Sequence, residues 1–390
     1  MESGERFDVI IIEEFHSEAL KYIAYHLKAP LIVLNSMDAN EWVNHYQGNP
    51  DSPAYTPTLH SLQLSCNMSF FERVFNSLVY VYFALIRNFI LIPVQNSMLH
   101  KYYPEAPHLN HFIYNVSLVL LNADPSVHEP QSIVPSMVNV GGFHIRKTRQ
   151  LPNDLQEVLD NAKYGVIYFS MGSTLRSKDI PEDKLKILLE TFSKLKVTVL
   201  LKLEGRQLTK TPSNVVIKDW FPQNDLLAHK NLKLFITHGG LFSVLEAVYH
   251  AVPILALPVF ADQYTNSKRA AANGYAKFIP FREIDEENFD SYVNDMLQNH
   301  KYKKNIMRRS KILTDKPMTA AESVNYWVEY VIRHQGAPHL KVAALNLSWY
   351  QYILLDVIAF ITALLVLLIY IVKKVFYLIF RTSYKKEKLN

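Results

Sequence analysis

Short apolar runs alternate with longer amphipathic segments between residues 163 and 340, and few folds accommodate this pattern. The expected strands are residues 165–170, 197–201, 215–218, 234–237 and 254–257, and the expected helices are residues 182–194, 242–250, 263–273, 286–299 and 320–333. Because the connections are only a few residues long, consecutive strands must pair in parallel through right-handed crossovers. The pattern therefore predicts a doubly wound α/β domain.

The first part of the chain is less regular but carries similar signals. The expected elements are strands at residues 7–12, 30–34 and 116–122, a helix at 17–27, and a mixed, aromatic-rich stretch at 60–115. Gly141, Gly142 and the segment at Pro152 are typical of a linker. We therefore expect two α/β domains, at residues 1–145 and 146–345.

Composition excludes several classes of protein. With 390 residues, 49% hydrophobic and 12% aromatic side chains, the chain can bury a large core, which excludes a disordered protein. The net charge of +5 comes from 41 basic and 36 acidic residues, and part of the excess lies at the very end, so nucleic-acid binding is not expected. The single cysteine, Cys66, excludes an internal disulfide and a thiolate metal cluster.

Residues 354–372 (LLDVIAFITALLVLLIYIV) form a long apolar run with one charge, Asp356. As a helix, a run of this length spans about 28 Å, close to the roughly 30 Å hydrocarbon core of a bilayer. A buried core helix is the alternative, but a basic tail at the chain end seldom follows one. We expect a transmembrane helix at residues 352–372 and a basic cytosolic tail at residues 373–390.

The flanks of this run predict its orientation. Trp349, Tyr350 and Tyr352 precede it, and six lysines and arginines follow it, so the positive-inside rule places the tail in the cytosol and the preceding domains in the lumen. The terminal KEKLN is similar to dilysine-type signals that return membrane proteins to the endoplasmic reticulum, although a plain solvated basic tail is the alternative. We expect a single-pass protein of the endoplasmic reticulum membrane.

Two further features bear on entry into the lumen. Asn67, Asn115 and Asn346 each begin an Asn-x-Ser sequon and would accept glycans there. The opening MESGERFDVIII, however, lacks the charged region, apolar region and cleavage site of a signal peptide. We expect that the chain as written either cannot reach the lumen or lacks its start.

Polar and aromatic residues follow several expected strands, at the edge where open parallel sheets bind ligands. They are Ser173; Trp220, Phe221 and Gln223; His238, Gly239 and Gly240, leading into a helix with Ser243 and Glu246; and Asp262 with Gln263. Taken singly these signals are weak, because a histidine at a strand end is more often structural and a Gly-Gly pair is usually a turn.

Together, these residue types can bind each part of a nucleotide sugar. An indole stacks on a base, a carboxylate accepts hydrogen bonds from ribose hydroxyls, and glycines at a helix N-terminus let a diphosphate approach the main chain. A neighbouring carboxylate and amide suit sugar hydroxyls. The constellation predicts a nucleotide-sugar site at this sheet edge.

Residues 235–263 (FITHGGLFSVLEAVYHAVPILALPVFADQ) resemble the signature of the UDP-glycosyltransferases of glycosyltransferase family 1. Their sequence is most similar to that of the insect members. Residues 220–229 (WFPQNDLLAH) look like the segment that precedes this signature, and the resemblance extends to residues 7–15, 327–340 and 355–360. It implies the GT-B fold, in which two Rossmann-like domains face a cleft. The first domain, expected to be incomplete here, would bind the acceptor and the second the UDP-sugar.

The resemblance also implies roles for the nucleoside contacts. Trp220, with Phe221 beside it, would stack on uracil, and Gln223 would contact the uridine. Glu246 would bind the ribose hydroxyls. No cofactor and no metal ion is implied, because the UDP-sugar is the donor substrate.

A second group of contacts would hold the diphosphate and the sugar. His238 and Ser173, with main-chain N–H groups near Gly239 and Gly240, would bind the pyrophosphate. The residues implied for the sugar are Asp262 and Gln263.

One departure concerns the phosphate site: vertebrate members carry Asn four residues after the motif histidine, where this chain has Phe242. One phosphate contact is therefore in doubt, unless the adjacent Ser243 replaces it.

The larger departure concerns catalysis. The family inverts the anomeric centre by direct displacement, with a histidine as general base on the acceptor hydroxyl and an acidic residue orienting it. No residue matches the position of the base, and His16, His26 and His111 lack its motif context. The orienting acid matches Glu13, for which a solvated strand-end carboxylate is the alternative. Because a missing base usually costs about 10²- to 10⁴-fold, we expect this chain alone to be weakly active or inactive.

The leading hypothesis is a hexosyltransferase that moves glucose from UDP-glucose, with inversion, to hydroxyl groups of small lipophilic acceptors. UDP-glucuronate is the alternative donor. A second hypothesis is a non-catalytic UDP-sugar-binding membrane protein that pairs with full-length relatives and modulates them. A nucleotide-sugar epimerase fits poorly, because such enzymes are normally soluble and lack this anchor.

Overall fold

In this computed structural model the chain forms two compact units, Met1–Lys341 and Val342–Asn390, which we describe separately. The structure describes residues 5–61, 64–173, 175, 177–205, 208 and 210–387. The last residues of the expected cytosolic tail, 388–390, lie outside the described residues.

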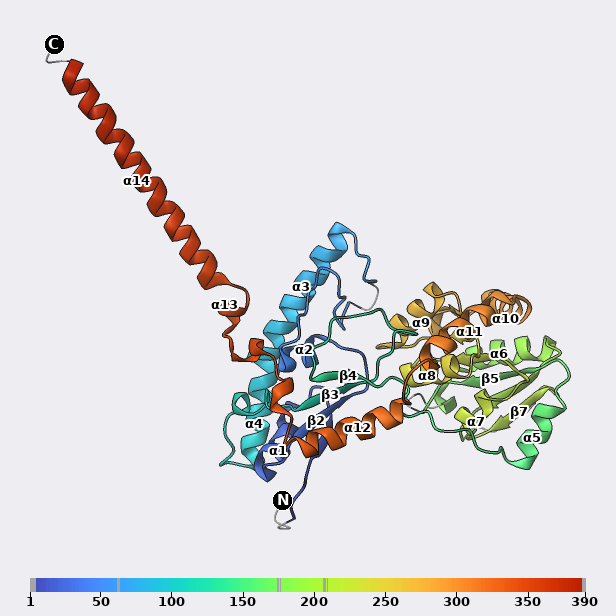
Figure 1. The fold of residues 1–390 in the computed structure, drawn as a ribbon. Coiled ribbons are helices and arrows are strands. Elements are labelled where there is room, and N and C mark those ends of the chain that lie inside the picture. Colours follow the sequence, from blue (N-terminus) through green and yellow to red (C-terminus); the bar gives the residue numbers. More distant parts are fainter. Residues whose placement is uncertain are drawn as a thin grey trace. The chain divides into compact units, whose positions relative to one another are not determined.

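Four parallel strands form the first sheet, in the order β1-β2-β3-β4 (Figure 1). They are β1 (Ile10–Glu13), β2 (Leu31–Asn35), β3 (Leu118–Leu121) and β4 (Met137–Asn139). All residues of β3 are buried, as expected for a central strand of a parallel sheet covered on both faces. The three strands predicted in this region are confirmed, and β4 extends the sheet.

Short helices accompany this first sheet. They are η1 (Glu18–Lys21), α1 (Tyr22–Leu27), α2 (Glu41–Gln47) and η3 (Leu109–His111). The side chain of Asn40 accepts hydrogen bonds from the N–H groups of Trp42 and Val43 at 3.1 and 3.4 Å. This cap fixes the start of α2, and with it the position of Glu41.

Six parallel strands form the second sheet, in the order β10-β9-β8-β5-β6-β7 (Figure 1). They are β5 (Val166–Ser170), β6 (Thr198–Lys202), β7 (Val215–Lys218), β8 (Leu232–Thr237), β9 (Ile254–Ala256) and β10 (Ala276–Phe278). The strand order reverses where β5 pairs with β8, and open α/β sheets bind ligands at such a point. The prediction of a doubly wound parallel domain is confirmed.

The helices around the second sheet run from residue 153 to residue 314. They are α5 (Asn153–Asp160), η4 (Ser177–Asp179), α6 (Glu182–Lys194), α7 (Gln223–Leu227), α8 (Leu241–Tyr249), α9 (Gln263–Ala272), η5 (Phe281–Glu283), α10 (Glu286–Gln298) and α11 (Lys301–Thr314). No side chain caps the start of α8 at Gly240, so the N–H groups of its first turn are available to a ligand. We call residues 5–145 the first lobe and residues 146–319 the second lobe.

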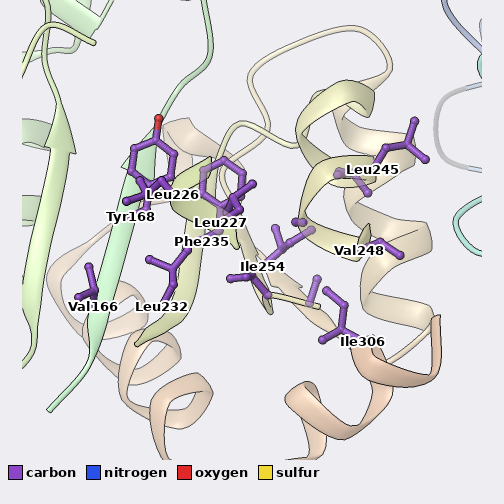
Figure 2. Packing of buried hydrophobic residues seen from close by; sticks show 14 of the residues in the cluster. Val166, Tyr168, Leu226, Leu227, Leu232, Phe235, Leu245, Val248, Ile254 and Ile306 are labelled. Carbon is purple, nitrogen blue, oxygen red and sulfur yellow. The ribbon is translucent and has the colours of Figure 1, made fainter. Parts of the chain in front are cut away.

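A continuous apolar core lies between the second sheet and its helices, and Figure 2 shows part of it. Its labelled members are Val166, Tyr168, Leu226, Leu227, Leu232, Phe235, Leu245, Val248, Ile254 and Ile306. Leu245 and Val248 anchor α8 to the sheet through its apolar face. The N-terminus of α8 is therefore held rigidly at the carboxyl edge of the sheet.

A long apolar helix occupies the stretch for which the sequence indicated only mixed structure. It consists of α3 (Phe70–Ile86), the π turn η2 (Arg87–Leu91) and α4 (Ile92–Tyr102). Its length and mean hydropathy of 1.8 would suit a membrane span. However, β2 precedes it, β3 follows it, and these two strands pair directly in one sheet. A span would separate the paired strands across a bilayer, so this helix does not cross a membrane.

Helix α12 (Ala320–Arg333) lies against the first sheet (Figure 1). Its Val331 is fully buried in a cluster with Ile32 of β2 and Leu118 of β3, and Trp327 packs beside it. The helix η6 (Pro338–Leu340) follows. A segment that follows the second lobe in sequence thus covers the sheet of the first.

The unit Val342–Asn390 is built around one long helix. The short helices η7 (Ala343–Asn346) and α13 (Trp349–Tyr352) precede α14 (Leu355–Glu387). The part of α14 from Leu355 to Ile379 has a mean hydropathy of 2.8 and buries none of its apolar window in the protein. The predicted apolar helix is confirmed as a helix of sufficient length to span a bilayer, and the crossing itself stays a prediction.

Replacing Phe235 by Ala tests the core that supports the second sheet. Phe235 is fully buried and stacks on Tyr168, with ring centroids 5.0 Å apart. Removing a buried phenyl ring costs about 3–5 kcal/mol, so we expect a clearly lower melting temperature for the detergent-solubilised protein. The control Phe71→Ala removes the same ring from a side chain that is 80% exposed. Equal losses in the two variants would contradict this assignment of the core.

Candidate active site

A cavity of about 550 Å³ lies between the two lobes, at the carboxyl ends of both sheets. The first lobe contributes Phe15, His16, Ser36, Met37, Leu59 and His60 to its lining, and the second lobe contributes Gly172, Ser173, His238, Gly240, Leu241, Phe242, Ser243, Phe260, Ala261, Asp262 and Gln263. The volume is in the range of small-molecule and cofactor sites.

Two glycines enclose the imidazole of His238 in the cavity wall. A Cβ atom added at Gly172 would lie 2.6 Å from Cε1 of His238, and one added at Gly240 would lie 2.4 Å from Nε2. No other residue type could approach the ring so closely at either position. Burial, with a smaller contribution from Lys202, lowers the pKa of His238 to about 4, so the ring is uncharged at neutral pH.

Lys202, the last residue of β6, connects this wall to Trp220. Its Nζ donates to the carbonyl oxygen of Gly172 at 2.8 Å and lies 4.5 Å from the centroid of the indole. Glu204 pairs with the same Nζ at 2.8 Å. The Lys202 side chain is buried, whereas Trp220 is 66% exposed. An exposed aromatic surface therefore lies beside a buried cation that contacts the cavity wall at Gly172.

A second line of contacts leads from the cavity to Glu246. The side-chain amide of Gln223 donates to the hydroxyl of Ser243 at 3.2 Å and to the carboxylate of Glu246 at 2.5 Å. Burial raises the pKa of Glu246, against the effect of the Gln223 hydrogen bond. Phe242 also lines the cavity, where its ring adds apolar surface rather than a phosphate ligand.

Asp262 and Gln263 line the cavity at the start of α9. The side-chain amide oxygen Oε1 of Gln263 accepts hydrogen bonds from the N–H groups of Val259 and Phe260 at 2.9 and 3.2 Å, which uses that oxygen within the preceding turn. Asp262 accepts from Asn266 at 2.7 Å, and burial raises its pKa. The amide N–H groups of Gln263 and the carboxylate of Asp262 remain for a ligand.

Six predicted residues do not line the cavity. Three of them, Trp220, Gln223 and Glu246, are connected to its wall through the contacts described above. Phe221 is 1% exposed in the core beside Tyr168, so it could contact a ligand only through its main chain. A Cβ atom added at Gly239 would lie 2.4 Å from Oγ of Ser267, so this glycine allows α9 to approach the strand end. Glu13 is exposed at the end of β1, outside the cavity lining.

The cavity contains two histidines of the first lobe for which the sequence offered no role. His16 follows β1 and has a φ of 54°, which is uncommon for a residue other than glycine. Its position shortly after an expected strand is the sequence feature that could have marked His16 as a site residue. His60 lies in the loop before α3, where no sequence signal marks it. Among the described residues, no group of three or more His, Cys, Asp or Glu side chains could hold a metal ion.

Comparisons with known proteins agree with this geometry. The family model described as "UDP-glucoronosyl and UDP-glucosyl transferase" matches residues 2–390. The chain belongs to this family. UDP-glucosyltransferase 2 of Dactylopius coccus is 36% identical over 391 residues, covering 99% of this chain and 76% of the relative. UDP-glucuronosyltransferase 2B16 of Oryctolagus cuniculus is 31% identical over 389 residues, covering 98% of this chain and 74% of the relative.

A solved structure confirms the fold of this UDP-glycosyltransferase family member. The crystal structure of UDP-glucose: anthocyanidin 3-O-glucosyltransferase in complex with UDP matches with a TM-score of 0.55 and 16% identity. The match covers 83% of this chain and 75% of that chain. The predicted GT-B fold and the predicted family are both confirmed, and the family is one of transferases.

Replacing Gly172 by Ala tests the fit around His238. The added methyl group would push the imidazole out of the cavity wall, so we expect affinity for UDP to fall about tenfold or more, which corresponds to about 1.4 kcal/mol. Gly205→Ala is the matched control, because Gly205 also has a positive φ, of 60°, but nothing lies within 4 Å of its added Cβ. Calorimetric titration with UDP measures both. An equal loss of UDP affinity in the two variants would show that backbone strain, rather than the contact with His238, lowers the affinity.

Proposed function

We propose that this protein transfers a hexose from a UDP-sugar, with UDP-glucose as the preferred donor, to hydroxyl groups of small lipophilic acceptors, with inversion of the anomeric centre. One observation carries the proposal: His238 lines the cavity, and side-chain contacts connect the cavity wall to Trp220 and Glu246, which lie outside the lining. Lys202 makes the connection to Trp220, and Gln223 makes the connection to Glu246. Family membership supports the donor class. The choice of sugar and acceptor rests on the chemistry of the lining.

The diphosphate would lie at the N-terminus of α8. The uncapped N–H groups that follow Gly240 donate to phosphate oxygens, and the positive end of the helix favours their charge. Neutral His238 and the exposed hydroxyl of Ser173 add donors. Buried Lys202 supplies the positive charge nearby, since its Nζ already contacts the loop of Gly172.

The uridine would lie along the surface between Trp220 and Glu246. The exposed indole of Trp220 offers a face for the base. Glu246 accepts hydrogen bonds from the ribose hydroxyls, and Gln223, which already donates to Glu246, orients that carboxylate. Ser243 lines the cavity and accepts a hydrogen bond from Gln223, so it connects this surface to the cavity.

The lining favours a neutral sugar over a charged one. Asp262 and the amide of Gln263 suit hydroxyl groups. None of the described lining residues is a lysine or arginine that would pair with the carboxylate of a glucuronate. Desolvation of an unpaired carboxylate is unfavourable, so glucose is the donor sugar that fits best.

The acceptor would occupy the apolar part of the cavity. Its apolar lining residues are Phe15, Met37, Leu59, Leu241, Phe242 and Phe260. Such a surface favours a small, largely apolar molecule with a hydroxyl group. The helix Leu355–Ile379 supports a membrane-anchored enzyme, for which we propose the endoplasmic reticulum membrane with the domains in the lumen.

Replacing Glu246 by Gln tests the ribose contact. A hydrogen bond to a charged group contributes about 1.5–3 kcal/mol, so its loss should weaken UDP binding by about tenfold or more. Titration with UDP measures this effect. Glu329→Gln changes an exposed carboxylate on α12, away from the cavity lining, and should bind UDP as the unchanged protein does. Unchanged affinity in Glu246→Gln would contradict the proposed orientation of the nucleotide.

A comparison of donors tests the proposed reaction itself. With a small lipophilic alcohol as acceptor, we expect kcat/KM for UDP-glucose to exceed that for UDP-glucuronate by about tenfold or more, because one unpaired buried charge costs at least about 1.4 kcal/mol. Product formation is measured by mass spectrometry. Equal or greater transfer from UDP-glucuronate would overturn the assignment of glucose.

A further inference from the structure

The first-lobe side of the cavity contains a histidine–carboxylate pair that the donor site does not use. His60 lines the cavity, and its Nε2 lies 3.9 Å from Oε1 of Glu41. Both atoms are buried, and neither has a hydrogen-bond partner. Unsatisfied buried polar atoms are costly, so a small rotation that joins these two in a hydrogen bond is favourable.

Neighbouring residues hold both members of the pair. Glu41 is the first residue of α2, after the cap Asn40, and its Oε2 accepts a hydrogen bond from the N–H of Leu59 at 3.1 Å. The imidazole of His60 stacks on Phe83, with ring centroids 3.5 Å apart and planes 10° apart. The His60 side chain is 27% exposed and its Nε2 is buried toward Glu41, which leaves Nδ1 as the ring nitrogen available to a ligand.

We propose that His60 is the base that removes the proton from the acceptor hydroxyl, and that Glu41 is its positioning residue. The inference rests on the function proposed above. The acceptor oxygen forms a bond to the anomeric carbon, the bond from that carbon to the β-phosphate oxygen breaks, and UDP leaves with the electron pair. The acceptor proton passes to Nδ1 of His60, while Glu41 accepts the Nε2–H and stabilises the imidazolium. Solvent then takes the proton.

Burial gives both groups the protonation states that this step requires. It lowers the pKa of His60 to about 4, so the ring is uncharged and can accept a proton at neutral pH. It raises the pKa of Glu41 to about 7, against a hydrogen bond from Leu59 that lowers it. Only the charged carboxylate stabilises an imidazolium, so transfer should increase as the pH rises through about 7.

Other titratable and charged groups face the pair from the elements packed around it. They are Asp38, Asp51 and His16, with His45, Tyr80 and Arg87 around the small cavity beside Glu41. Of these, His16 is the other histidine of the main cavity. Its Nδ1 is buried against Trp42, with ring centroids 4.0 Å apart, and it has no ion-pair partner among the described residues. The two histidines of the cavity therefore differ in that only His60 has a carboxylate, that of Glu41, beside its ring.

The test uses the full chain in detergent, UDP-glucose as donor and 1-naphthol as a small lipophilic acceptor. His60→Gln should lower kcat by about 100-fold or more, the usual effect of removing a general base, and leave the affinity for UDP unchanged. Glu41→Gln should lower kcat less and abolish the rise with pH near 7. His111→Gln changes an exposed histidine of η3 in the same lobe and is the control.

A second measurement separates loss of the base from damage to the fold. His60→Ala should regain transfer when free imidazole is added, whereas the His111 variant should not respond. Wild-type transfer by His60→Gln, absence of rescue in His60→Ala, or an unchanged pH profile in Glu41→Gln would overturn the assignment. UDP binding without any transfer by the unchanged chain would also overturn it but leave the donor site intact. A chain that does not bind UDP would instead refute the proposed function on which the inference rests.

Discussion

The pairing of β5 with β8 determines where the donor-side residues lie. Ser170 and Thr237 are partners in the parallel register, so the chain leaves the sheet at neighbouring points after each strand. Gly172 and His238 then follow at short distances and come into contact. The contact is possible only because glycine has no Cβ at either side of the imidazole. Sheet topology and two small residues together create the wall on which a diphosphate would lie.

Burial controls the charge of this cavity more than any pair of opposite charges does. It lowers the pKa values of His238 and His60, and it raises those of Glu246, Asp262 and Glu41. Each shift favours the neutral form of the side chain. The buried charge of Lys202, by contrast, is balanced by Glu204. A diphosphate that carries its own negative charge can compete with Glu204 for that cation, so the site is suited to an anionic ligand.

The sequence predicted features whose causes are local or follow from sheet topology. The strands of the second sheet, and the positions of Ser173, His238 and Asp262 near one cavity, follow from short apolar runs and from the rule for parallel sheets. The helix from Phe70 to Tyr102 was missed although its first part, α3, is amphipathic, and few of its apolar side chains are buried.

Residues that depend on loop geometry could not be predicted either. Glu41 and His60 meet only because α2 and the following loop fold back on one another, and their spacing in the sequence carries no known motif. Lys202 was overlooked because a lysine at the end of a strand normally points to solvent, whereas here it is buried under Trp220.

Two contacts hold the two lobes against each other, as the proposed transfer across the cavity would require. Helix α12 follows the second lobe in sequence but packs on the first sheet through Val331. Arg269 of α9 pairs with Asp38 of the first lobe at 3.0 Å, and both side chains are mostly buried. Helix α9 also begins with Gln263, which lines the cavity. A sugar bound at the start of α9, as proposed, would therefore contact the same helix that joins the lobes.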